Sequence, residues 1–260
     1  MGYIDIHTHI LPGLDDGPAT LPEALALAAA LVEKGFTAVI ATPHCFEGKP
    51  AAPAILENLG EINRALSERS IPLRVLPGAE HALEPQLVKR LQDGAVLTLN
   101  RGRCLLIELP LYQPLPPYTR DLLFELRARA YYPILAHPER VMAFQDHFSS
   151  LLEIVRGGAM TQLTLASLTG VMGPEAQRTA KRMLKHKLAH FAATDAHSPG
   201  PRLGAVPRAA ALLEQDLGPG AAALLLSERP QLLLENRPVL LLETETTAQP
   251  PRRPRRGLLT

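Results

Sequence analysis

The feature that most constrains the fold of this 260-residue chain is a regular alternation of short apolar runs with helical stretches. The apolar runs predict seven strands, at 3–6, 37–41, 73–76, 104–109, 133–136, 159–163 and 190–193. Helical patterns separate them, at 21–34, 54–69, 85–92, 122–130, 148–156 and 175–186, with more helix expected beyond Val206. Strands that alternate with helices indicate a mostly parallel sheet. Because about seven such units occur without a GxGxxG fingerprint, we expect an α/β barrel rather than an open nucleotide-binding sheet.

Composition excludes several classes of protein. Hydrophobic residues make up 46% and charged residues 20% of the chain, close to globular averages, which rules out a wholly disordered protein. No apolar run reaches about 18 residues, so no membrane span or stable membrane insertion is expected, and the first residues do not resemble a signal peptide. The net charge is +1, and a body this close to neutral argues against a dedicated nucleic-acid-binding protein.

The two cysteines, Cys45 and Cys104, are too few for a disulfide scaffold. A reducing cytoplasmic location is therefore expected. Neither cysteine begins a C-x5-R loop, because Ala51 and Pro110 stand where the arginine is needed. Cysteine-dependent phosphatase chemistry is thereby excluded.

The domain organisation follows from a change of composition near the C-terminus. Residues 1–242 are expected to form one domain, and 243–260 a basic Pro/Arg-rich tail that is disordered. Four arginines lie between 252 and 256. A solvated terminus is the simplest interpretation of this run, and contact with acidic lipid or RNA is the alternative.

Ionisable side chains follow nearly every predicted strand. In chain order they are His7, His9, Asp15, Asp16, His44, Glu80, Glu108, His137, Asp195 and His197. The C-terminal ends of parallel barrel strands share one face, where active sites lie. One histidine at a strand end is more often structural, but joint placement on successive strands favours a metal site. Histidine and carboxylate ligands suit Zn, Mn or Fe. Because the set exceeds the needs of one ion, and a carboxylate such as Glu80 could bridge two, we expect two or three ions.

At these residues the sequence resembles the polymerase and histidinol phosphatase (PHP) superfamily, and more narrowly the bacterial CpsB/YwqE-type tyrosine-protein phosphatases. The resemblance covers about Tyr3 to Arg237. It is carried by Asp5-Ile6-His7-Thr8-His9, Leu11-Pro12-Gly13-Leu14-Asp15-Asp16-Gly17-Pro18, Thr42-Pro43-His44, Gly78-Ala79-Glu80, Leu106-Ile107-Glu108-Leu109-Pro110, His137-Pro138-Glu139-Arg140 and Thr194-Asp195-Ala196-His197. Cys45 and Ser198 depart from the residues common in relatives, and neither departure removes a ligand.

The resemblance implies a distorted (β/α)7 barrel of the PHP type with its metal site at the C-terminal ends of the strands. Two or three divalent ions are implied, manganese foremost, with Zn, Fe, Co or Mg as alternatives. The implied ligands are His7, His9, Asp16, His44, Glu80, Glu108, His137, Asp195 and His197. The implied catalytic residues are Arg140, Asp195 and His197, and the implied phosphate-binding residues are Arg140 and, by a weaker match, Arg202.

The implied activity is that of a protein-tyrosine phosphatase, a phosphoric monoester hydrolase that uses a metal-activated hydroxide. The implied substrate is a phosphotyrosine protein, foremost a bacterial tyrosine kinase of capsule or exopolysaccharide synthesis. A histidinol-phosphate or other small-molecule phosphomonoesterase of the same superfamily remains an alternative. A metal-dependent amidohydrolase and a non-catalytic, metal-binding regulatory module are the others.

Overall fold

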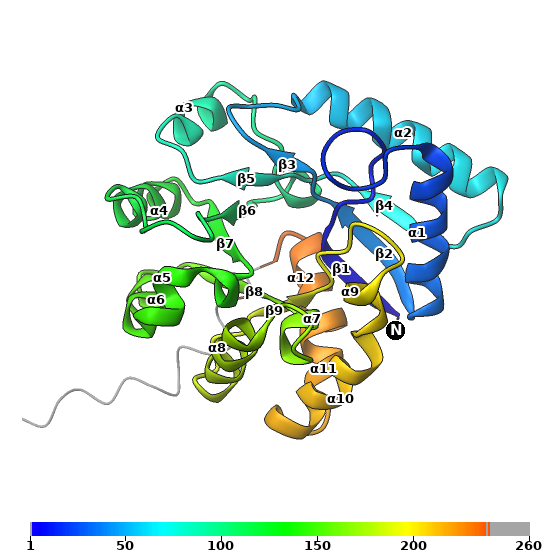
Figure 1. Cartoon of the computed structure of the whole chain (residues 1–260). Helices are drawn as coiled ribbons and strands as arrows, with labels where there is room; N and C mark the ends of the chain where they lie inside the picture. The colour runs from blue at the N-terminus through cyan, green and yellow to red at the C-terminus, as the bar shows by residue number, and fades with distance from the viewer. Residues whose placement is uncertain (1, 238, 240–260) are drawn as a thin grey trace, which may run out of the picture.

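The computed structural model describes residues 2–237 and 239, and places the strands at the centre with most helices around them (Figure 1). The strands are β1 (Tyr3–Thr8), β2 (Phe36–Ala41), β3 (His44–Cys45), β4 (Arg74–Leu76), β5 (Glu80–Ala82), β6 (Cys104–Glu108), β7 (Tyr132–Ala136), β8 (Met160–Thr164) and β9 (Phe191–Ala193). Each of the seven predicted strands is present. β3 and β5 are additional, and prolines explain why. Pro43 and Pro77 lack an N–H for strand pairing, and each separates one short strand from the next.

The helices connect successive strands, as the sequence pattern predicts. They are α1 (Leu21–Glu33), α2 (Ala52–Glu68), α3 (Leu87–Gln92), α4 (Thr119–Ala128), α5 (Met142–Asp146), α6 (Phe148–Arg156), α7 (Leu165–Leu168), α8 (Pro174–Lys185), α9 (Pro201–Gly204), α10 (Val206–Leu217), α11 (Ala221–Ala223) and α12 (Arg229–Leu234), with 3-10 turns η1 (Leu99–Arg101) and η2 (Pro138–Arg140) and a π-helical turn η3 (Leu224–Glu228). Helix α1 begins where it does because Thr20 and Glu23 form a capping box, in which each side chain bonds the other residue's backbone N–H.

All strand pairs between these elements are parallel, which confirms the expected α/β fold. One sheet has the order β1-β2-β4, and the other has the order β3-β5-β6-β7-β8-β9. Backbone hydrogen bonds join the sheets beyond β9. Asp195 N–H donates to the His7 carbonyl at 3.0 Å, and His9 N–H donates to the Ala196 carbonyl at 2.9 Å. The end of β1 therefore lies against the segment that follows β9.

The strands are buried on both faces, as parallel strands covered by helices usually are. Along β6, Leu105 and Ile107 belong to a large apolar cluster with the surrounding helices, and the intervening Leu106 belongs to a second, smaller cluster. This smaller cluster also contains Ile6 and Phe191. With apolar packing on both faces, the polar side chains collect where the strands end.

Two further expectations concern the C-terminal tail and membrane-spanning helices. The tail at 243–260, and with it the boundary at 242, lies outside the described residues. Within the described part, none of the helices combines the length and the apolar character needed to cross a membrane.

Candidate metal centre

The first two histidines come from the end of β1, and both are fully buried. Asp5, also on β1, holds this end of the strand in place through hydrogen bonds. Its carboxylate accepts hydrogen bonds from the backbone N–H groups of His7 and Thr194 and from the Thr194 hydroxyl. The buried Asp5 side chain therefore ties β1 to the loop that carries Asp195. Sequence analysis assigned it no such role.

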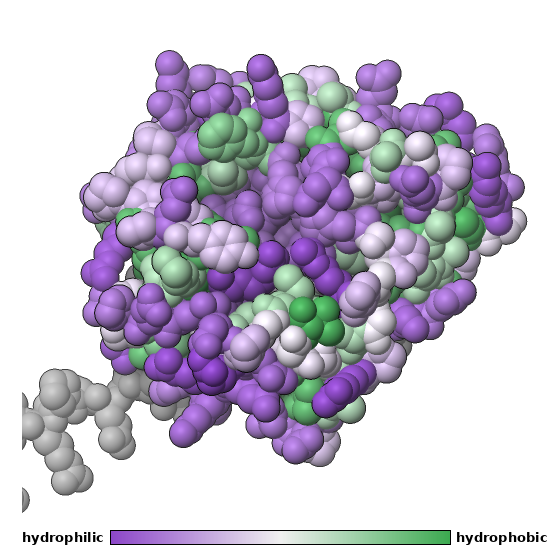
Figure 2. All heavy atoms as spheres, viewed as in Figure 1, coloured by the Kyte–Doolittle hydropathy of each residue, from purple (hydrophilic) through white to green (hydrophobic). Residues whose placement is uncertain are grey.

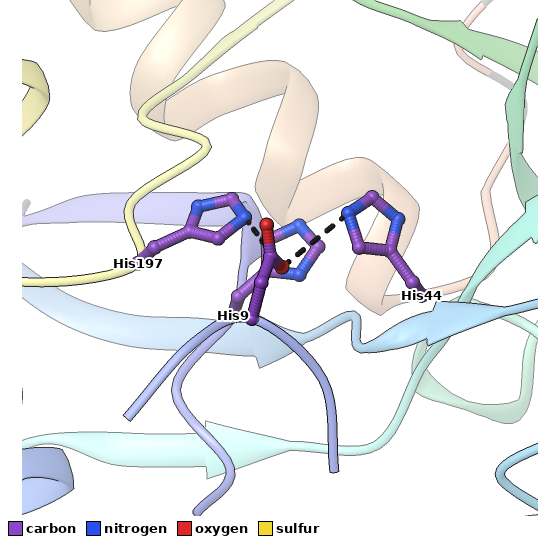
Figure 3. Close-up of side chains that lie close together, drawn as sticks. His9, His44 and His197 are labelled. Atoms are coloured by element: carbon purple, nitrogen blue, oxygen red, sulfur yellow. Dashed lines mark ion pairs between the residues drawn. The ribbon is translucent and has the colours of Figure 1, made fainter. Parts of the chain in front are cut away.

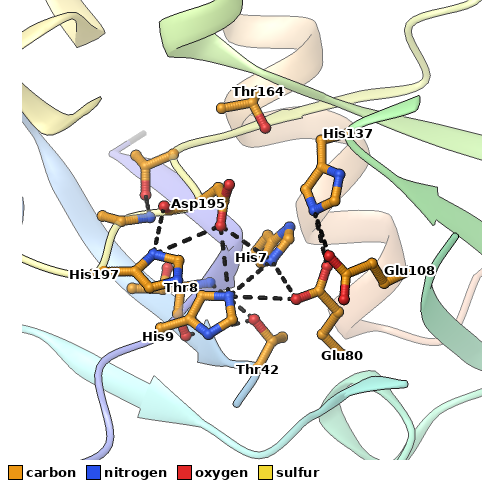
Figure 4. A network of polar contacts seen from close by, with 12 residues as sticks. His7, Thr8, His9, Thr42, Glu80, Glu108, His137, Thr164, Asp195 and His197 are labelled. Atoms are coloured by element: carbon orange, nitrogen blue, oxygen red, sulfur yellow. Dashed lines mark hydrogen bonds and ion pairs between the residues drawn. The ribbon is translucent and has the colours of Figure 1, made fainter. Parts of the chain in front are cut away.

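The structure brings all nine predicted metal ligands into one cluster. Of these, Figure 4 labels His7, His9, Glu80, Glu108, His137, Asp195 and His197. Four groups of ligand atoms, each within 4.8 Å of one another, could hold an ion: His9, Asp16, His44 and His197; His7, Glu80 and His137; His7, His9 and Asp195; and His44, Glu80 and Glu108. Because the groups share members, they form one continuous site rather than four separate ones. Figure 3 shows His44 and His197 on either side of one carboxylate, which belongs to Asp16, with His9 close by.

Glu80 lies at the centre of the cluster and is fully buried. Its Oε2 atom lies 2.9 Å from His44 Nδ1 and 3.3 Å from His7 Nε2, and its Oε1 atom lies 3.1 Å from His137 Nε2. Despite these neighbours, Oε2 lacks a hydrogen bond of acceptable geometry. A buried oxygen left in this state is costly. A divalent cation among these nitrogen and oxygen donors would satisfy it, so the residues fit a metal ion.

The electrostatics of the cluster favour positive charge. Burial acts to raise the pKa of Glu80, but His7 and the hydrogen-bonded histidines hold it well below its usual range. Burial also acts to lower the pKa of His9, yet the neighbouring carboxylates of Asp15 and Glu80 raise it to about 9. For His44, Glu108 and Glu80 overcome the same burial effect and raise the pKa to about 11. Protons and metal ions therefore compete for the same ring nitrogens.

Adjacent aspartates serve the cluster in different ways. Asp15 has a 4% exposed side chain and accepts hydrogen bonds from His9 Nδ1 at 2.7 Å, from His44 N–H at 3.1 Å and from Gly17 N–H at 2.9 Å. Its carboxylate thereby leaves His9 Nε2 facing the cluster. Asp16 is 67% exposed and lies 3.1 Å from His197 Nε2.

Gln162 on β8 performs a similar orienting role and was missed by sequence analysis. Its Oε1 atom lies 2.8 Å from His7 Nδ1 and accepts the His137 backbone N–H at 3.2 Å. Because an amide oxygen only accepts hydrogen bonds, His7 must be protonated on Nδ1, which leaves Nε2 free for an ion. The signal available in the sequence was a glutamine within the predicted strand 159–163.

Two arginines converge on Asp195 at the edge of the cluster. Nη1 of Arg140 lies 2.8 Å from Asp195 Oδ2, and Nη1 of Arg202 lies 2.9 Å from the same atom. Arg202 also donates to the Asp195 carbonyl at 2.6 Å. Both arginines remain partly accessible while Asp195 is buried, so their guanidinium groups can reach an anion bound beside the cluster.

Arg140 is held in place by its neighbour Glu139, to which sequence analysis assigned no role. The Glu139 side chain is fully buried and accepts hydrogen bonds from Thr164 N–H at 3.0 Å and from the Ser167 hydroxyl at 2.7 Å. Burial raises the pKa of this carboxyl. The contacts anchor the turn η2, which carries Arg140, to the end of β8.

The sequence matches the family of capsular polysaccharide synthesis proteins CpsB/CapC over residues 3–235. The chain belongs to the CpsB/CapC family. Tyrosine-protein phosphatase YwqE of Bacillus subtilis is 35% identical over 219 residues, covering 83% of this chain and 85% of the relative. Tyrosine-protein phosphatase CpsB of Streptococcus agalactiae is 28% identical over 235 residues, covering 88% and 96%.

A solved structure extends this CpsB/CapC relationship to three dimensions. It belongs to the crystal structures of YwqE from Bacillus subtilis and CpsB from Streptococcus pneumoniae, which are described as unique metal-dependent tyrosine phosphatases. It superposes with a TM-score of 0.86 at 35% identity and covers 90% of this chain and 95% of the other. Each of these CpsB/CapC relatives is named a tyrosine phosphatase, which favours that hypothesis over a histidinol-phosphate phosphatase, an amidohydrolase or a regulatory module.

Proposed function

We propose that this member of the CpsB/CapC family is a metal-dependent protein-tyrosine phosphatase, a phosphoric monoester hydrolase. The observation that carries the proposal is the continuous cluster of nine ligands with Arg140 and Arg202 at its edge. A regulatory module without turnover would be expected to have lost ligands, and the cluster contains every one that the resemblance implies.

The proposed architecture is a single distorted (β/α)7 barrel of the PHP type, formed by residues 1–242. In this interpretation β2 with β3, and β4 with β5, each act as one bent strand, so that nine short strands make seven positions. The parallel pairing through both sheets and the hydrogen bonds between the end of β1 and residues 195–196 support it. The metal centre then lies at the C-terminal ends of the strands.

The proposed cofactors are two or three divalent ions, with manganese foremost and Zn, Fe, Co or Mg as alternatives. Their ligands would be the nine residues of the cluster, and Glu80, which belongs to two of its groups, could contribute to more than one ion. When bound, such ions lower the pKa of coordinated water and so make hydroxide available near neutral pH. His197 has its pKa lowered to about 4 by burial and by the neighbouring His9, so its ring is neutral at pH 7 and suited to ligation.

The proposed roles of the arginines follow from their chemistry. A guanidinium binds two phosphate oxygens at once, so Arg140 and Arg202 can both orient the phosphoryl group and neutralise charge that develops on its oxygens. Asp195 keeps both side chains in position by accepting their N–H groups. A tyrosyl leaving group has a phenol pKa of about 10, and its departure needs less protonation than that of an alkoxide.

The proposed substrate is a phosphotyrosine protein, foremost a bacterial tyrosine kinase of capsule or exopolysaccharide synthesis. The names of the relatives and of the family support this assignment. A cytoplasmic location is part of the proposal and is based on the sparse cysteines, both of which are free in the structure.

Phosphate release by metal-stripped protein, with and without added Mn²⁺, tests the proposal. A phosphotyrosine peptide and histidinol phosphate are compared, with Arg140→Ala as the variant. We expect Mn²⁺-dependent release from the peptide, and loss of most of that activity in Arg140→Ala with retained metal. Release from histidinol phosphate alone would overturn the substrate assignment, and full activity of Arg140→Ala would overturn the role of the arginine.

A further inference from the structure

Two hollows of different character lie on either side of Asp16, within a face whose central hollow Figure 2 shows to be strongly hydrophilic. The smaller one, about 300 Å³, is lined by Asp16, His197 and Arg202 together with Ser198, Gly200 and Pro201. The larger one, about 540 Å³, is lined by the apolar side chains of Leu14, Phe46 and Pro50, and also by Gly13, Asp15, Asp16, His44 and Lys49. Each hollow therefore contains one cationic side chain, Arg202 or Lys49, and the phenyl ring of Phe46 lies in the larger one.

Phe46 is an unusual member of this surface, because the residue is 62% exposed although it sits on a turn held by several hydrogen bonds. Phe46 and Lys49 exchange backbone hydrogen bonds of 3.0 and 2.9 Å. The Glu47 N–H donates to the Glu84 carboxylate at 2.7 Å, and Gly48 adopts φ of 76°, which suits the residue. The turn therefore presents an aromatic side chain to solvent beside the metal ligand His44, without burying it in the core.

We propose that the hollow formed by Leu14, Phe46 and Pro50 holds the aromatic ring of the leaving group and makes the enzyme selective for aryl over alkyl phosphates. This inference rests on the proposed phosphatase function and adds the residues that choose the substrate. The side chains of Leu14, Phe46 and Pro50 take part in none of the hydrogen bonds or ion pairs described above for the metal ligands and the two arginines.

The apolar side chains decide which hollow suits the ring of the substrate. A phosphoryl group is anionic and is attracted to Arg202 and to cations at the cluster. The phenyl ring is apolar and gains from contact with Leu14 and Pro50 and from packing against the Phe46 ring. Since Asp16 and His44 belong both to the ion-binding cluster and to the larger hollow, a phosphate bound at the cluster places its substituent at the entrance of that hollow.

An alkyl phosphate gains nothing from this arrangement. The phosphoserine side chain has a single carbon between its ester oxygen and the backbone, and so it offers no ring to Phe46. The exposed aromatic surface would thus separate phosphotyrosine from phosphoserine without any hydrogen bond to the ring.

Binding of two inert phosphonates to the manganese-loaded protein tests the proposal by calorimetry. Phenylphosphonate carries the ring and methylphosphonate does not. We expect wild type to prefer phenylphosphonate by about tenfold, as aromatic packing and burial of a ring permit. Phe46→Ala should reduce the preference to about twofold or less by weakening phenylphosphonate alone, and Phe46→Tyr should restore it, because it keeps the ring.

The matched control is Phe124→Ala, which removes another exposed phenyl ring, 70% accessible, from α4. We expect it to leave the binding of both phosphonates unchanged. Equal binding of the two phosphonates by wild type would overturn the proposal. So would an equal loss of both in Phe46→Ala, since that result would place the defect in the metal or phosphate site.

Turnover measured in the same preparations separates this inference from the proposed function. If wild type prefers phenylphosphonate but releases no phosphate from a phosphotyrosine peptide, the phosphatase proposal fails while the ring-binding hollow stands. If it hydrolyses phosphotyrosine and phosphoserine peptides with the same kcat/KM, and binds both phosphonates equally, the phosphatase proposal stands and the ring-binding hollow fails.

Discussion

The neighbouring residues Asp15 and Asp16 allow a sharp test of the site, because the same isosteric change should act differently at the two positions. Asp15→Asn replaces one carboxylate oxygen by an NH₂ group, which cannot accept hydrogen bonds. That group must then face either Gly17 N–H or the pair formed by His9 Nδ1 and His44 N–H. Whichever way the amide turns, at least one buried donor loses its acceptor.

The structure sets the size of the expected effects. A lost hydrogen bond to a charged group costs about 2 kcal/mol of unfolding free energy, or about 4–8 °C in Tm for a chain of this length. Loss of a carboxylate that orients a metal-binding histidine lowers metal affinity about 10- to 100-fold. Asp16 accepts no backbone N–H in the described part of the chain and is 67% exposed. Asp16→Asn should therefore lower manganese affinity while the Tm of the metal-free protein stays within about 1 °C of wild type.

The assay is a manganese titration of each metal-stripped variant, followed by calorimetric melting in chelator. The two readouts separate a ligand from a residue that positions a ligand. Wild-type melting and wild-type manganese affinity in Asp15→Asn would refute the orienting role. A fall in the metal-free Tm of Asp16→Asn as large as that of Asp15→Asn would show that the two residues do not differ as described.

Three further predictions concern other parts of the described chain. Glu80→Gln should abolish retention of at least one manganese ion after gel filtration, measured by elemental analysis, because the amide cannot bridge two ions; full retention would contradict the central role of Glu80. Gly17→Ala should lower Tm and manganese affinity, because its Cβ would lie 2.5 Å from the His9 carbonyl oxygen. Gly60→Ala, whose Cβ would meet no neighbouring atom within 4 Å, should raise stability by about 0.5–1 kcal/mol. Similar losses in both variants would argue against the close approach at Gly17. Burial, and after it Arg229, lowers the pKa of His190 from 6.5 to about 4. Between these pH values the unfolded chain binds more protons than the folded chain, so stability falls with falling pH by up to about 1.4 kcal/mol per pH unit. Denaturant melts of His190→Asn should show a shallower slope of stability against pH in this range, and an unchanged slope would refute the assignment.

The course of the chain could be predicted from sequence because most strands contain a short apolar run. Helix α8 and strand β7 lie within about two residues of the predicted ranges 175–186 and 133–136. The short strands β3 and β5 escaped prediction because two or three residues carry no periodicity. Their pairing, which sets His44 opposite Glu80, depends on neighbours far along the chain.

The candidate site likewise contains residues that the sequence predicted and residues that it missed. Ligand candidates such as His7 and Glu80 were found because they follow apolar runs, so topology alone places them on one face. Gln162 and Glu139 were not found, because their roles depend on which strand lies beside which. Gln162 lies within the strand β8 and becomes relevant only because β8 pairs with β7, which leads into His137. Sequence periodicity carries no information about such cross-strand partners.

The hydrogen bonds between the end of β1 and the loop after β9 have a consequence for the life of the protein in the cell. They join groups as distant in the chain as Asp5 and Thr194, which are 189 residues apart. The N-terminal histidines are synthesised first, yet they meet Asp195 only after most of the chain has left the ribosome. A nascent or truncated chain therefore lacks the complete cluster, and the proposed metal site would be assembled only late in synthesis.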